Sequence, residues 1–133
     1  MRRSWKTLRV VLEDVEEDRL EEKLESFDEE KNQERLASPG TPSKIQEAED
    51  LYYGHLLLAL DAGLIEGVTV KTASPYWNYG ATSPRLTMRG HDMLDAIRSD
   101  TVWSKVEKAA SSLSIPITLD LIKTVLASVS KAI

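Results

Sequence analysis

The expected fold is decided by residues 52–67, which read YYGHLLLALDAGLIEG. Apolar side chains recur here at the spacing that places them on one face of a helix: Tyr53, Leu56, Leu57, Leu60 and Leu64. Gly63 has no Cβ, so it can adopt the left-handed conformation that ends a helix. We therefore predict one helix that ends near Gly63, after which the chain folds back under the last turn.

The residues after this helix predict a β-hairpin and then further helices. Residues 68–72, VTVKT, are β-branched and alternating, and residues 85–87 can return antiparallel after a long loop over residues 73–84. Helical spacing resumes at Thr87 and, after a possible break at residues 99–101, continues to Val106, with Ser99 or Asp100 as the cap of the continuation. This order favours a mostly α (α+β) fold, a winged helix-turn-helix with a two-stranded wing.

The first fifty residues predict a helix followed by an acidic extension. Residues 4–17 are amphipathic, and Ser4 is suited to cap their helix. Residues 18–36 are rich in acids around a narrow apolar seam, and we favour a helix to about residue 36 over a partly ordered arm. Two prolines and a glycine mark residues 37–43 as a loop, where Thr41 or Ser43 can cap the next helix.

We expect three parts along the chain. Residues 1–17 form the first core helix, residues 18–43 an acidic extension and linker, and residues 44–133 the winged-helix core with a C-terminal helix. Residues 43–50 either continue into the helix of residues 52–67 or form a separate short helix. The last helix is predicted from another apolar stripe: Leu119, Ile122, Val125, Leu126, Val129 and Ile133.

Composition limits the class of protein. A chain of 133 residues without cysteine suits one cytoplasmic domain and excludes disulfides, thiol catalysis and cysteine-ligated zinc. No apolar run is long enough to cross a bilayer, and the N-terminus does not resemble a signal peptide, so we expect no membrane association. Of the net charge of −5, residues 1–50 carry −6 and residues 51–133 carry +1. DNA binding depends on a local basic face, so the acidic total does not exclude it.

Two stretches resemble a known family: YYGHLLLALDAGLIEG at 52–67 and LTMRGHDMLDAIRSDTVWSKV at 86–106. The second is the more specific, because the match runs over many consecutive positions. Together they resemble a bacterial and phage family of small uncharacterised proteins, a domain of unknown function that looks like a winged helix. The resemblance covers residues 45–108 and the first helix, and it implies that fold and a phage or prophage origin.

The predicted hairpin is the candidate nucleic-acid site. Between residues 68 and 90 it has three cations and no acid, interleaved with aromatic side chains that can stack on bases. The candidate contacts are Lys71, Arg85, Arg89, Tyr76, Trp77 and Tyr79, together with His55 on the outward face of the preceding helix. The alternative for the three aromatic residues is packing onto their own domain.

That outward helix face is otherwise unsuited to reading DNA. It presents Gly54, His55, Leu58 and Asp61, whereas base contacts are usually made by Arg, Lys, Asn or Gln. Leu58 instead suggests cover by the C-terminal helix or by a partner chain. Arg98 and Trp103 are candidate protein-interaction residues, with an ion pair and a core anchor as the alternative.

Catalysis and metal binding are not expected. The chain has no nucleophile elbow, phosphate loop or His-Glu-x-x-His motif, so we predict neither enzymatic activity nor a cofactor. His55 and His91 are the only histidines, and structural hydrogen bonds account for them better than a zinc site does.

Two functional hypotheses remain open. The first is a DNA-binding regulator that contacts double-stranded DNA through the wing and its helix. The second is a winged helix used as a protein-interaction module, in which the acidic arm and the Leu58 side bind a host or phage protein. In either case the C-terminal helix can mediate a homodimer. A contiguous positive face would favour DNA, whereas an acidic or apolar face would favour protein.

Overall fold

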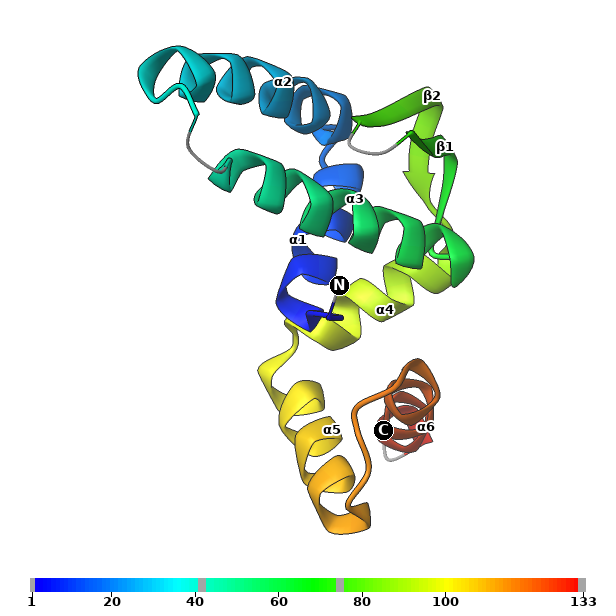
Figure 1. Ribbon diagram of the computed structural model, residues 1–133. Coiled ribbons are helices and arrows are strands. Elements are labelled where there is room, and N and C mark those ends of the chain that lie inside the picture. Colours follow the sequence, from blue (N-terminus) through cyan, green and yellow to red (C-terminus); the bar gives the residue numbers. More distant parts are fainter. Residues whose placement is uncertain (1, 41–42, 74–75, 132–133) are drawn as a thin grey trace. The chain divides into compact units, whose positions relative to one another are not determined.

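The computed structural model describes residues 2–40, 43–73 and 76–131 (Figure 1). Within them lie six helices and one antiparallel pair of strands, so the prediction of a mostly helical α+β protein is confirmed. The elements are α1 (Trp5–Glu16), α2 (Leu20–Ala37), α3 (Lys44–Asp61), β1 (Ile65–Ala73), β2 (Tyr76–Leu86), α4 (Met88–Arg98), α5 (Asp100–Leu113) and α6 (Leu119–Lys131). The chain forms two compact units, Met1–Gly90 and His91–Ile133.

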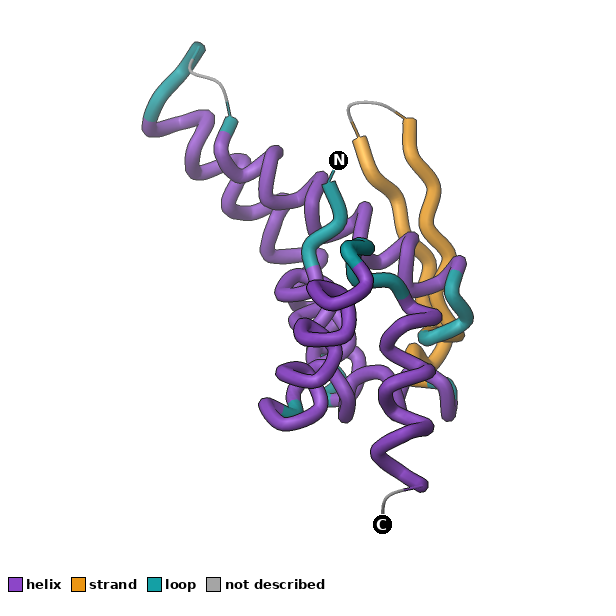
Figure 2. Tube along the Cα trace, turned by 90° about the horizontal axis from the view of Figure 1, so that it is seen from below, coloured by secondary structure: helices purple, strands orange, loops and turns teal. Residues whose placement is uncertain are grey.

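Helix α3 is the centre of the first unit, because α1, α2 and β1 all pack against it. Figures 1 and 2 show α2 and α3 lying side by side. The predicted helix to residue 36 is confirmed by α2, and α3 is continuous from Lys44, so no separate short helix precedes it. The core of the three helices is formed by Leu8, Val11, Leu12, Val15, Leu20, Leu24, Phe27, Tyr52, Tyr53, Leu56 and Ala59.

The buried face of α3 differs in part from the predicted stripe. Leu57 and Leu60 are only half-buried, whereas Tyr52 and Ala59 are buried. The core face is therefore rotated toward Tyr52, Leu56 and Ala59. This rotation also carries His55 into the interior, where its side chain is completely buried.

Both helix starts that sequence assigned to serine in this unit are confirmed. The Ser4 hydroxyl accepts from the Thr7 N–H at 3.2 Å, and the Ser43 hydroxyl accepts from the Gln46 N–H at 2.9 Å. The alternative cap, Thr41, lies outside the described residues. At the other end of α3, Gly63 has a φ of +72° and reverses the chain as predicted.

The hairpin is longer than predicted, and the long loop over residues 73–84 is wrong. Strand β2 occupies most of that stretch and pairs with β1 from Ile65↔Leu86 to Ala73↔Tyr76. The error comes from treating Gly80 and Pro84 as loop residues. Gly80 pairs with Thr69, whereas Pro84 lies at the irregularity between Glu66 and Val68, where residues 82–84 have no partner in the register. A proline without an N–H is tolerated where the ladder is interrupted.

Two hydrogen bonds of the buried side chains Tyr52 and His55 hold α1 on α3. The Tyr52 hydroxyl donates to the Asp14 carboxylate at 2.7 Å, and His55 Nε2 accepts from the Ser4 N–H at 2.7 Å. Burial raises the pKa of Tyr52, and the adjacent Asp14 carboxylate raises it further, so the hydroxyl remains a donor. Each bond satisfies a polar group that would otherwise be costly to bury.

The start of α4 contacts the exit of α3 too closely for any side chain at Gly90. The Thr87 N–H donates to the Leu64 carbonyl at 3.0 Å, and the Thr87 hydroxyl donates to the Gly63 carbonyl at 2.6 Å. A Cβ built at Gly90 would lie 2.0 Å from that Leu64 carbonyl oxygen. Glycine is required here because the atoms that a side chain would meet belong to the backbone of Leu64, which cannot move aside as a flexible side chain can.

The second unit contains the rest of α4 together with α5 and α6. Ser99 caps α5 by accepting from the Val102 N–H at 3.3 Å, which selects it over Asp100. Ser114 ends α5 with a φ of +54°. The buried side chains of this unit are Met93, Leu94, Ala96, Ile97, Val102, Val106, Ala110, Leu121 and Ile122. Among the described helices, none combines the length and the apolar character needed to cross a membrane.

We predict that Gly90→Ala lowers the free energy of unfolding by about 2 kcal/mol or more, because the new methyl group forces backbone apart. Met88→Ala, on the same helix turn but 84% exposed, is the control and should change stability by less than about 0.5 kcal/mol. Urea unfolding followed by circular dichroism measures both. Equal midpoints for Gly90→Ala and the wild type would contradict the close contact.

We also predict that Tyr52→Phe lowers the free energy of unfolding by about 1 to 3 kcal/mol, because it removes the nearer donor of the buried Asp14 carboxylate and leaves the Arg19 guanidinium at 3.4 Å. Tyr79→Phe is the matched control: its hydroxyl is 3.4 Å from Glu25 in an exposed contact, and its loss should cost less than about 0.5 kcal/mol. The same urea experiment compares them. A Tyr52→Phe variant as stable as Tyr79→Phe would show that the buried bond is unimportant.

Candidate functional site

The outward face of α3 is acidic and apolar. Its exposed side chains include Glu47, Asp50, Leu51 and Asp61, and Leu58 is half-buried among them. Helix α3 has no arginine, and its single lysine is Lys44 at the first position. The sequence placed Leu58 on this face correctly, but His55 does not belong to it.

His55 cannot contact nucleic acid, so its assignment to that site is wrong. Its side chain is fully buried, with Nε2 bonded to the Ser4 N–H and Nδ1 2.8 Å from the Leu51 carbonyl oxygen. Both ring nitrogens are thus engaged inside the first unit. The sequence prediction that this histidine makes structural hydrogen bonds is confirmed.

The three aromatic residues of the hairpin divide by strand alternation. Trp77 and Tyr79 share one face of β2, where the Trp77 ring stacks on Tyr53 with centroids 5.0 Å apart and planes 3° apart. The Trp77 indole also donates to Asp50 at 2.8 Å. Tyr76 belongs to the opposite face and is 66% exposed. Packing onto their own domain therefore accounts for Trp77 and Tyr79, but not for Tyr76.

The three cations of the predicted site are also unequal. Arg85 forms an ion pair with Glu66, the residue opposite it in the hairpin register. Arg89 is exposed, with one guanidinium nitrogen 3.5 Å from the Ala62 carbonyl oxygen, and Lys71 is exposed on β1. Arg89 thus lies at the end of α3, near the exposed Asp61, whereas the charge of Arg85 is offset by Glu66.

The other two candidate interaction residues lie in the second unit. The Arg98 guanidinium pairs with Asp95 at 2.9 Å, one helical turn away. Trp103 is half-buried on α5. The ion pair agrees with the structural alternative that sequence offered for Arg98, and an exposed pair of this kind contributes little to stability.

Acidic and basic side chains also meet where α2 and α3 join, a feature that the sequence did not indicate. The buried Glu49 carboxylate accepts from Lys31 at 2.8 Å and from the Gln46 amide at 3.2 Å. The Glu34 carboxylate accepts from the Ser43 hydroxyl at 2.5 Å and from the Lys44 N–H at 3.1 Å. These contacts depend on the packing of α2 against α3, which residue spacing within α2 cannot reveal.

Hydrogen bonding to the start of α3 stabilises the charged form of Glu34. The Ser43 hydroxyl is the largest cause of its lowered pKa. Burial opposes this effect, and the N–H groups of Ile45 and Lys44 lower the pKa further. The carboxylate thus caps α3 from outside the helix, at the end where the helix dipole favours a negative charge.

These features define a small helical protein with a packed β-hairpin and an acidic exposed face. The chain belongs to the family described as "Hypothetical protein (DUF2513)", which matches residues 2–116. The predicted membership of an uncharacterised domain family is thereby confirmed.

One relative is an "Uncharacterized protein" of Haemophilus influenzae (strain ATCC 51907 / DSM 11121 / KW20 / Rd). It is 37% identical over 71 residues, which cover 53% of this chain and 58% of that protein's length. No solved structure gives a significant match to this chain.

We predict that Glu34 contributes a pH-dependent part of the stability. A carboxylate whose pKa is lowered on folding stabilises the fold above its unfolded pKa of about 4.3, and this contribution is lost as the pH falls through the folded pKa. The difference in urea midpoint between the wild type and Glu34→Gln should therefore shrink as the pH falls from about 5 toward 2. Glu29→Gln, at an exposed position of the same helix, is the control. A Glu34→Gln effect that is independent of pH would contradict the role of the charge.

Proposed function

We propose that this protein is a winged helix that acts as a protein-interaction module, with α1, α2 and α3 as its helices and β1–β2 as its wing. The outward face of α3 then binds a partner protein that presents basic and apolar side chains. The observation that carries this proposal is the composition of that face, where Glu47, Asp50 and Asp61 accompany Leu51 and Leu58.

The charge of this face opposes DNA binding. Affinity for DNA comes largely from lysine and arginine at the phosphates, and specificity from donors and acceptors at base edges. This side of α3 presents the exposed carboxylates of Glu47 and Asp61 and two leucines, beside Asp50, which accepts a hydrogen bond from Trp77. Such a face would be repelled by phosphates and would leave the base edges without partners. The same side chains suit a protein surface, because complementary charges around an apolar centre favour correct association.

Two leucines on the outward face of α3 provide apolar surface that a partner protein can bury. Leu51 is 37% exposed and Leu58 is half-buried, and they lie seven residues apart on one side of α3. Residues at this spacing are two helical turns apart. A partner helix or loop can bury both leucines while its cations meet the surrounding acids.

DNA binding by the wing is the second candidate, favoured by the exposure of Lys71, Tyr76 and Arg89. These side chains can follow a phosphate backbone and stack on an unpaired base. The contact would rest on the hairpin and the first turn of α4, which contains Arg89, with little contribution from α3.

We predict that partner capture depends on the α3 face. Affinity purification of the tagged protein from its native cells, followed by mass spectrometry, should recover a partner with the wild type and lose it with Leu51→Asp. Leu36→Asp is the matched control, because Leu36 is 84% exposed on α2 and lies outside this face. Glu47→Lys with Asp61→Lys should also abolish capture, since both acids are exposed.

A DNA titration completes the test. Fluorescence anisotropy with a labelled random duplex, at low and moderate salt, should show no salt-sensitive binding at micromolar protein. Binding that weakens steeply with salt and is abolished by changing Lys71, Arg85 and Arg89 to Ala would overturn the proposal in favour of DNA. Equal loss of partner with Leu51→Asp and Leu36→Asp would exclude the α3 face.

A further inference from the structure

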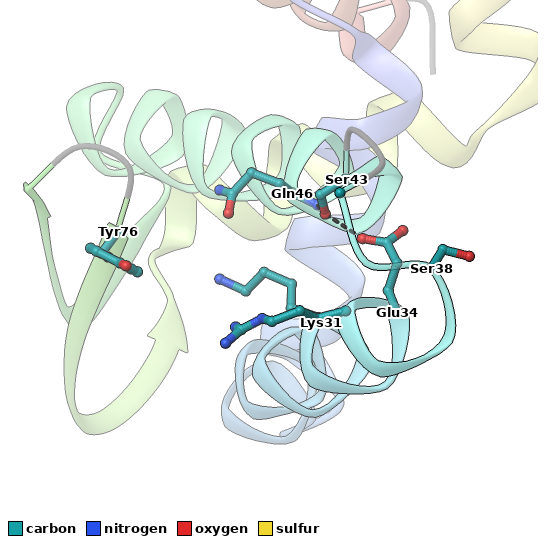
Figure 3. A pocket seen from close by; sticks show the side chains of 8 residues that line it. Lys31, Glu34, Ser38, Ser43, Gln46 and Tyr76 are labelled. Atoms are coloured by element: carbon teal, nitrogen blue, oxygen red, sulfur yellow. Dashed lines mark hydrogen bonds between the residues drawn. The ribbon is translucent and has the colours of Figure 1, made fainter.

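A cavity of about 290 Å³ opens on the first unit between the end of α2, the start of α3 and the start of β2 (Figure 3). Its walls include Lys31 and Arg35 from α2, Gln46 from α3 and Tyr76 from the hairpin. In Figure 3 Lys31 and Gln46 extend toward the side on which Tyr76 lies. The volume is at the lower end of the range of small-molecule sites.

The carboxylate in the wall does not make this cavity acidic. Glu34 is bonded to the Ser43 hydroxyl and to the N–H groups of Lys44 and Ile45 at the start of α3. Its negative charge is therefore directed at the positive end of a helix dipole and at three donors. The repulsion between Glu34 and an incoming anion is therefore largely offset by these donors.

The two cations of α2 have different roles. The Lys31 ammonium is fixed 2.8 Å from Glu49 and 3.6 Å from Asp28, and these carboxylates offset its charge. Arg35 lies one turn further along, is exposed, and donates to the neutral Asn32 amide oxygen at 3.4 Å. Arg35 thus supplies the positive charge of the cavity, in a planar form that suits bidentate binding of an oxyanion.

Tyr76 supplies an exposed aromatic surface on the opposite wall. Its neighbours in the strand, Trp77 and Tyr79, belong to the other face, where Trp77 packs on Tyr53. Tyr76 remains 66% exposed beside the cavity. An aromatic ring of this kind offers stacking to a planar ligand, and its hydroxyl can donate a hydrogen bond.

We propose that this cavity binds a small anion in which a phosphate or carboxylate is joined to a planar ring. Arg35 holds the oxyanion, Tyr76 stacks on the ring, and the Gln46 side chain lies within the same wall. Nucleoside monophosphates and aromatic carboxylates share this chemistry. The site is separate from the outward face of α3 proposed to bind protein, and its test requires no protein partner.

Nuclear magnetic resonance titration of the full chain, labelled with nitrogen-15, tests the site with two probes, adenosine monophosphate and benzoate. We expect saturable shifts of the Arg35 side chain and of the amides of Ser38, Gly40 and Gln46 with at least one probe. A response to adenosine monophosphate alone assigns the site to nucleotides, and a response to benzoate alone assigns it to carboxylates. Inorganic phosphate and adenosine, each added alone, should bind at least fivefold more weakly than the nucleotide.

Three variants connect the shifts to the cavity. Arg35→Gln and Tyr76→Ala should each weaken binding at least fivefold. Both side chains are exposed, so neither change should disturb the fold, and the unchanged positions of the other amide signals check this. Lys71→Gln, which removes an exposed cation of the hairpin, should leave the affinity unchanged. The proposal is overturned if neither probe gives saturable shifts, if Lys71→Gln weakens binding as much as Arg35→Gln, or if Tyr76→Ala has no effect.

Discussion

The packing of the first unit depends on satisfying two polar side chains that α3 buries, Glu49 and His55. Both are almost inaccessible to solvent, so each needs a partner inside the protein. His55 accepts a hydrogen bond from the Ser4 N–H, which fixes the start of α1. Glu49 accepts one from the Lys31 ammonium, which fixes the C-terminal half of α2. Apolar contacts alone would tolerate small shifts of either helix along α3. The two polar contacts do not tolerate such shifts, because a buried charge or hydrogen-bond acceptor without a partner is costly.

The same constraint determines which side chains reach the surface. With His55 and Tyr52 facing inward, the outward side of α3 is left with acids and leucines. The hairpin then packs its Trp77 face against α3, through the stack on Tyr53 and the bond to Asp50. Strand alternation turns Tyr76 the other way. A hairpin whose aromatic residues looked equivalent in the sequence therefore presents one exposed ring beside the end of α2.

Sequence periodicity was sufficient for the helices, because their apolar spacing and serine caps are local features. Ser4, Ser43 and Gly63 act as predicted. The prediction of a long hairpin loop was wrong because Gly80 and Pro84 resemble loop residues. In the structure Gly80 pairs with Thr69, and Pro84 lies where the register is interrupted, so both are compatible with a strand. The prediction that His55 faces outward was wrong because the core face of α3 is rotated. A shift of the core face by about one residue, roughly 100° around a helix, exchanges inward for outward positions.

The cavity beside Tyr76 could not be predicted, because its walls come from α2, α3 and the hairpin, which only tertiary packing brings together. Within α2, Lys31, Glu34 and Arg35 resemble an ordinary mixed-charge helix surface. Packing against α3 gives them different roles. Lys31 forms an ion pair with Glu49, and Glu34 accepts hydrogen bonds at the start of α3, whereas Arg35 remains exposed. The net charge of −5 is no guide to this region, because exposed charges further apart than about 8 to 10 Å are largely screened at physiological salt. Local pairing therefore allows an acidic helix to contribute the cation of an anion site.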